Sequence, residues 1–241
     1  MANIKREKEE QLALANMLSR IILSSSNISE LTEGFAKELK RFMSIDWGTI
    51  AWIERGDTVC FLPLSSKISL PPDFESTLPL GGTPIAWLAE NKRALLEPDL
   101  GKASQPWTAS FLGKLGKQEI RSMVLMPLFS GGEVFGSLIV GSRKPNVYRE
   151  RELKLLKYAA SQLALPLANS LLLHERLSTL VQDFRTPLTP VVACSGLLAE
   201  ELQAEPESAE AKLSQNIYRG AQELQTELSK LVEAGKTRQG T

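Results

Sequence analysis

The sequence contains little histidine and cysteine, and neither sign of charge is in excess. Its 241 residues include one histidine, His174, and two cysteines, Cys60 and Cys194. Two cysteines so far apart offer neither a disulfide framework nor a zinc ligand set, and they suit a reducing compartment. A mechanism that needs two histidines is excluded, and no metal site is expected.

Two further absences limit the class of protein. The 28 basic residues balance the 28 acidic ones without a long basic run, so we expect no nucleic-acid partner. Long apolar runs are missing, and the N-terminal segment does not resemble a signal peptide. With 43% hydrophobic and 23% charged residues, the composition is that of an ordinary globular protein. We therefore expect a cytoplasmic protein without membrane insertion.

The first 142 residues predict two helices followed by strands that pair in hairpins. Apolar positions recur at helical spacing over residues 5–23 and again from Leu31 to Phe42. Residues 63–83 are proline-rich and are expected to be an irregular loop. The remaining predicted elements are strands 46–54 and 58–62, a helix 85–91 opened by Pro84, a strand 93–96, a loop with some helix over 100–118, and strands 122–129 and 134–142.

The second hairpin has a distinctive pattern. One strand ends in Pro127-Leu128, a Gly-Glu turn follows, and the partner strand reads Val-x-Gly-x-Leu from Val134. Together with residues 82–90 and 148–156, this resembles the signature of GAF domains, which sense small molecules. The resemblance covers roughly residues 15–175. It implies an α/β (α+β) fold in which helices flank an antiparallel sheet.

A long helical pattern starts near Arg149 and keeps a heptad-like seam of apolar or small residues. The seam comprises Leu153, Leu156, Ala160, Leu163, Leu167, Ser170, His174, Leu177, Val181, Phe184 and Leu188. After a bend at 200–210, a returning helix carries Leu213, Ile217, Ala221, Leu224, Leu228 and Leu231 on one face. Such a hairpin cannot bury both stripes alone, so we expect a homodimer with a four-helix bundle. The expected division is an N-terminal helix 1–23, a sensor domain 24–172 and a helical hairpin 173–241.

Within this hairpin, residues 180–190 read Leu-Val-Gln-Asp-Phe-Arg-Thr-Pro-Leu-Thr-Pro. The stretch resembles the H-box of two-component sensor histidine kinases, Phe-x-His-Glu-Leu-Arg-Thr-Pro-Leu. Gln182 takes the place of the phosphorylated histidine, and its amide nitrogen has no free lone pair with which to attack ATP. Asp183 keeps the acid of the pattern, and Arg185 and Thr186 match it.

The resemblance implies a signalling or scaffold protein, with a sensory domain coupled to a hairpin that lacks the phosphoacceptor. Its expected partners are a histidine kinase, a response-regulator receiver domain, or both. No autonomous kinase activity is expected, because the chain to Thr241 also shows no ATP-binding pattern. Two alternatives stay open. The chain could belong to a kinase whose catalytic part is absent or on another chain, or it could be a receiver phosphatase in which Asp183 and Thr186 position water.

The resemblance also places a ligand pocket between the sheet and its covering loops, over residues 63–118. Trp87, Asp99, Trp107 and Arg121 are the candidate pocket residues, although packing, a turn cap or surface exposure explains each one alone. The cyclic-nucleotide pattern is incomplete, and bilin or haem attachment lacks a suitably placed cysteine or histidine. No cofactor is identified. An unknown small-molecule ligand and a domain that only dimerises are both open.

Overall fold

The computed structural model describes residues 2–25, 27–54, 57–64, 77–102, 119–201 and 208–237. Trp107 and the centre of the predicted bend, residues 202–207, lie outside these ranges. The chain forms two compact units, Met1–Asn169 and Ser170–Thr241.

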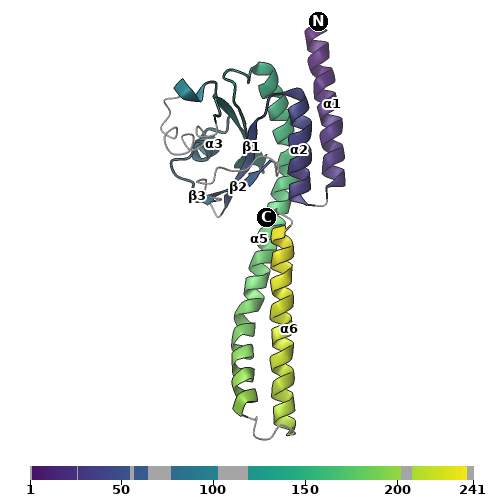
Figure 1. The fold of residues 1–241 in the computed structure, drawn as a ribbon, viewed down its shortest axis with the longest axis vertical. Coiled ribbons are helices and arrows are strands. Elements are labelled where there is room, and N and C mark those ends of the chain that lie inside the picture. Colours follow the sequence, from purple (N-terminus) through teal and green to yellow (C-terminus); the bar gives the residue numbers. More distant parts are fainter. Residues whose placement is uncertain are drawn as a thin grey trace. The chain divides into compact units, whose positions relative to one another are not determined.

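The first unit combines helices with one sheet (Figure 1). Its elements are α1 (Ala2–Ser24), α2 (Ile28–Phe42), β1 (Trp47–Glu54), β2 (Thr58–Pro63), β3 (Thr77–Pro79), α3 (Pro84–Asn91), β4 (Leu95–Glu97), η1 (Leu100–Lys102), β5 (Ser122–Ser130), β6 (Glu133–Ser142) and the start of α5 (Glu150–Glu201). The second unit contains the rest of α5 and α6 (Ala209–Thr237).

The six strands form one antiparallel sheet in the order β3-β2-β1-β6-β5-β4. Both predicted hairpins are confirmed, β1 with β2 and β5 with β6. The second turns through Gly131 and Gly132, whose positive φ angles of 58° and 85° favour glycine. The predicted α+β fold is therefore correct.

Two details differ from the sequence prediction. The segment expected to be only loop contains β3, in which Leu78 pairs with Val59. The strand predicted at 93–96 begins later, at Leu95, because Lys92 ends α3 in the left-handed conformation with φ 51°. This left-handed cap reverses the chain before pairing with β5 can start.

Each face of the sheet is covered by helices. On one face, Ile85 and Leu88 of α3 are fully buried against a core that includes Trp47, Met123 and Leu125. On the other face lie α2 and the start of α5 (Figure 1). Alternation along a strand places Val124 and Met126 on this second face, opposite to Met123 and Leu125.

Helix α1 packs against α2. It is also joined to α5, because the Arg151 guanidinium forms an ion pair with the Glu10 carboxylate at 2.8 Å. Hydrogen bonding to Glu10 raises the pKa of Arg151. The N-terminal helix is therefore part of the first unit and not a free extension.

In the second unit, α5 and α6 form an antiparallel hairpin whose inner seam is built of small residues. Ala211, Ser214 and Ala221 of α6 are buried, and the Ser214 hydroxyl donates to the Ser195 carbonyl of α5 at 2.9 Å. A Cβ added to Gly196 would lie 3.2 Å from the Tyr218 ring. The two helices therefore approach closely through small side chains.

Candidate functional site

Two of the predicted pocket residues, Asp99 and Arg121, bind each other. The Asp99 carboxylate accepts hydrogen bonds from Arg121 Nη2 at 3.0 and 3.2 Å and from Nε at 3.2 Å. These bonds from Arg121 hold the pKa of Asp99 below its usual value. The Leu100 N–H also donates to the Arg121 carbonyl at 2.7 Å. This clamp joins the end of β4 to the start of β5, so both side chains are already engaged.

Trp87 does not join that clamp. It lies on α3, and its ring packs against the core on the sheet face that α3 covers. The Arg93 guanidinium lies 5.1 Å from the centre of the ring, a distance typical of a cation–π contact. Trp87 therefore acts as part of the wall of this face.

Sequence reasoning missed two buried polar groups on this face. Glu97 of β4 is only 7% exposed, and burial raises the pKa of its carboxyl. Among the described residues, the buried indole N–H of Trp47 has no hydrogen-bond partner. The period-two pattern Leu95-Leu96-Glu97 could have indicated that Glu97 points inward with Leu95.

Sheet register places these two groups in one row. Trp47 pairs with Gly141, Gly141 with Met123, and Met123 with Glu97. A Cβ on Gly141 would lie 3.6 Å from Cε3 of Trp47, so the indole lies over the glycine. One row across the sheet therefore holds a hydrogen-bond donor and a carboxylate on the same face.

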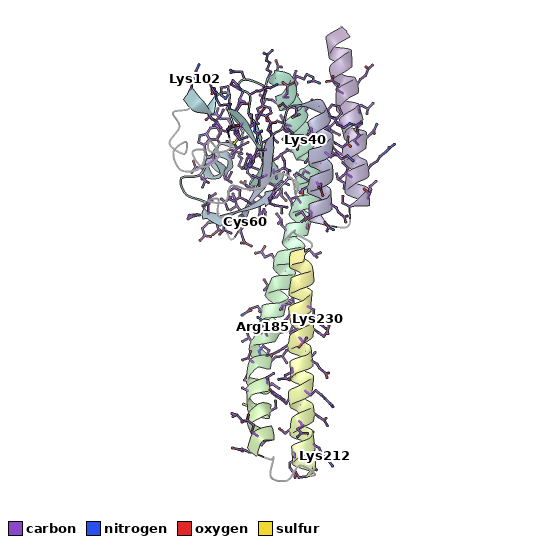
Figure 2. The ribbon with its side chains drawn as sticks, in the orientation of Figure 1. Lys40, Cys60, Lys102, Arg185, Lys212 and Lys230 are labelled. Carbon is purple, nitrogen blue, oxygen red and sulfur yellow. The ribbon has the colours of Figure 1, made fainter. Side chains whose placement is uncertain are left out.

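The H-box-like residues lie on α5 in the second unit, and the polar ones are exposed. The Thr186 hydroxyl donates to the Gln182 carbonyl one turn earlier, at 3.0 Å. Arg185 points across the hairpin and donates from Nη2 to the Ser229 hydroxyl at 3.1 Å; Arg185 and Lys230, the neighbour of Ser229, are labelled in Figure 2. Gln182 and Asp183 are solvent-exposed. These side chains form a polar surface and no enclosed catalytic pocket.

Beside this polar surface runs a set of exposed apolar side chains, called here the outer stripe. It consists of Leu173, Leu177, Leu180, Phe184, Val191 and Leu198 on α5, and Leu213, Ile217 and Leu224 on α6. Pro187 and Cys194 occupy the intervening heptad positions on α5.

Both halves of the outer stripe lie on one side of the hairpin. On each helix a stripe position comes one residue before a buried one, as with Leu180 and Val181 or Leu213 and Ser214. Because the helices are antiparallel, this shared offset turns both halves toward the same side. The single apolar seam predicted for α5 is therefore two stripes. One contains Val181 and is buried in the hairpin, and the other contains Phe184, which is 56% exposed.

The described ranges contain no group of three or more histidine, cysteine, aspartate or glutamate residues that could hold a metal ion. Among the same residues, no helix is both long enough and apolar enough to cross a membrane.

Comparisons with known proteins agree with this architecture. The GAF domain family matches residues 27–167. A GAF domain of a two-component sensor histidine kinase from Bacillus halodurans superposes with a TM-score of 0.52 at 17% identity, covering 61% of this chain and 98% of that one. Two GAF domains of phosphoenolpyruvate-protein phosphotransferases have a similar fold. The Acinetobacter domain has a TM-score of 0.54 at 16% identity, covering 68% of this chain and 96% of that one. The Coxiella burnetii domain has a TM-score of 0.51 at 14% identity, covering 66% and 94%.

At such identities the solved structures show the fold alone. No curated protein sequence matches the chain significantly. The family match, in contrast, covers more than half of the chain and includes every strand of the sheet. The chain therefore belongs to the GAF domain family.

Proposed function

We propose that the protein is a dimeric signalling scaffold of two-component type. Its GAF domain would sense a ligand, and its hairpin would dock a histidine kinase or a response-regulator receiver instead of accepting phosphate. One observation carries the proposal. The hairpin presents exposed Asp183 and Thr186 within an H-box-like stretch, next to an uncovered apolar stripe.

Dimerisation follows from that stripe. Nine large apolar side chains along one side of a two-helix hairpin form a contiguous patch of the kind that marks an interaction surface. A second copy offers the same patch, and a two-fold pairing of hairpins would bury both in a four-helix bundle. We therefore assign the outer stripe to the contact between two copies.

The polar surface beside the stripe would then remain open in the dimer. Gln182 cannot take up phosphate, because its amide nitrogen lone pair is delocalised into the carbonyl. Asp183 and Thr186 could still contact a receiver domain of the class that reads this surface in sensor kinases. This role needs binding but no phosphotransfer by the chain itself.

Capture of receiver domains tests the docking role. The immobilised full-length protein is incubated with purified receiver domains from the same genome, both free and phosphorylated. We expect at least one receiver to bind and the double variant Asp183→Ala/Thr186→Ala to weaken it by about tenfold. The matched control, Glu223→Ala/Thr226→Ala, removes an exposed acid and a threonine from α6, where Thr226 donates to the Gln222 carbonyl as Thr186 does to Gln182.

The role would be contradicted if no receiver bound, or if the control weakened binding as much as the test variant. The same binding assay with the dimerisation hairpin of a sensor kinase tests the other proposed partner, a histidine kinase. The alternative function, a receiver phosphatase that uses the exposed Asp183 and Thr186, is tested with the same full-length protein. It predicts that the protein accelerates the decay of a phosphorylated receiver and that Asp183→Ala removes this acceleration.

For the sensory domain we propose a small polar ligand on the α3 face. Such a ligand would accept a hydrogen bond from the buried Trp47 indole and offer a donor or cation to the carboxyl of Glu97, a residue that is 7% exposed. A thermal-shift screen of amino acids, amines and purines tests this proposal. A hit should lose its shift in Glu97→Gln, and a panel without hits would contradict the proposal.

A further inference from the structure

A recess lies on the sheet face opposite α3, against α5. Its volume is about 570 Å³, within the range of small-molecule sites. Met126, Pro127 and Phe129 of β5 form one side, Leu153 and Ala164 belong to α5, and residues 92–94 close the edge. The recess, called here the α5 groove, lies entirely within the first unit.

The α5 groove combines an apolar interior with a basic rim. Lys92, Arg93, Lys154 and Lys157 line it, and Glu150 is the one carboxylate that the described residues contribute. Glu150 pairs with Lys154 at 2.9 Å, and Lys92 pairs with Glu133 at 2.7 Å. Lys157 is exposed and has no ion pair or hydrogen bond with the described residues. A positive charge is therefore available at the mouth of an apolar recess.

Few groups in the groove could read a polar ligand. The Ser161 hydroxyl already donates to the Tyr158 carbonyl at 2.7 Å. Phe129 is 42% exposed, whereas Met126 is buried. The basic rim could pair with phosphate oxygens, but the donors and acceptors of a base or a sugar would find few partners on the apolar interior. The lining instead suits a ligand that is apolar along its length and anionic at one end.

We propose that the α5 groove binds an amphipathic carboxylate, an acyl chain with a single anionic head. The chain would cover Met126, Phe129 and Leu153, and the head would lie by Lys154 and Lys157. Burial of the chain supplies most of the affinity, because exposed ion pairs contribute little. The lysines fix the direction in which the chain enters.

The α5 groove is separate from the proposed ligand site of the α3 face. Met126 in the groove faces away from α3, whereas Glu97 faces α3 together with Leu95, so an acyl carboxylate and a polar ligand on the α3 face would not compete. One wall of the groove is α5 itself, from Glu150 to Ala164. Occupancy would therefore act on the helix that continues into the hairpin.

Calorimetry with dodecanoate below its micelle concentration tests the site in the full-length protein. We expect saturable binding of one dodecanoate per chain. Removing both charges at the mouth, with Lys154→Gln/Lys157→Gln, should weaken binding by about tenfold. Lys40→Gln, which removes one exposed charge of α2 (Figure 2), is the control and should leave binding unchanged.

Steric filling gives a second, independent test. Ser161 is exposed on α5, so Ser161→Trp should fold and abolish binding by occupying the groove, whereas Ser161→Ala should bind normally. Circular dichroism verifies that each variant is folded. Three results would overturn the proposal: absence of saturable binding, equal affinity for dodecanol, or undiminished binding by a folded Ser161→Trp protein. Binding of the protein to anionic vesicles without binding of free dodecanoate would also overturn it and would indicate a membrane surface instead.

Discussion

Truncating two side chains of the outer stripe should abolish the proposed dimer. Leu180 is 52% exposed and Phe184 56% exposed in the single chain. Fully burying a leucine or phenylalanine contributes about 1.5–3 kcal/mol, so burying the remaining half of each contributes about 1 kcal/mol. Two residues in two protomers give about 4 kcal/mol, which corresponds to an increase of roughly 10³-fold in the dimer dissociation constant. Alanine keeps the helix propensity of α5, so Leu180→Ala/Phe184→Ala should retain the hairpin.

Sedimentation equilibrium over a range of protein concentrations measures this constant. The control is Leu197→Ala, which removes a side chain that is 64% exposed but lies outside the stripe. Cys194 gives a second readout, since a short bis-maleimide should cross-link two copies through this heptad position in Cys60→Ser protein. A wild-type chain that stays monomeric at tens of micromolar, or a control as damaging as the double variant, would refute the reasoning.

Three further outcomes are expected. In the stripe variant Leu180→Ala/Phe184→Ala, iodoacetamide at pH 8 should label the exposed Cys194 and modify Cys60 at least roughly a hundredfold more slowly. The reason is that burial and the Glu54 carboxylate raise the pKa of the Cys60 thiol to about 12. Comparable labelling rates would contradict this. Glu97→Gln should raise the melting temperature at neutral pH. Burial raises the pKa of Glu97, so wild-type stability falls as pH rises from the ordinary value of 4.5 through the raised one, and melting curves should converge below that window. Gly136→Ala should destabilise the first unit by roughly 3 kcal/mol in urea unfolding, because the added Cβ would lie 2.3 Å from the Ala51 carbonyl oxygen. The control Gly220→Ala should be neutral or stabilising, because its Cβ would meet no atom within 4 Å.

Much of the sheet could be predicted because its signals are local. Alternating apolar residues around the Gly131-Gly132 turn encode the β5–β6 hairpin within about twenty residues. Strand β3 has only three residues and contains Pro79, so it is recognisable only through its pairing with β2. Short strands defined by a distant partner carry no periodicity of their own.

The candidate sites were harder to predict, because their geometry depends on contacts between distant residues. Asp99 and Arg121 are 22 positions apart, and nothing in their local sequence indicates that they form a pair. The division of the α5 seam was hidden for another reason. Two adjacent stripes, one with Val181 and one with Phe184, share the same heptad period, so periodicity alone merges them.

The brevity of β3 and β4 also limits how this protein can associate. At one margin of the sheet, β3 pairs with three residues of β2, and at the other β4 pairs with three residues of β5. Such short outer strands, one of them ending in Pro79, offer little backbone on which a foreign strand could extend the sheet. Self-assembly by strand exchange, a common route to aggregation, is therefore disfavoured in the GAF domain. The proposed pairing of hairpins uses side-chain packing between helices instead, where sequence can specify a partner.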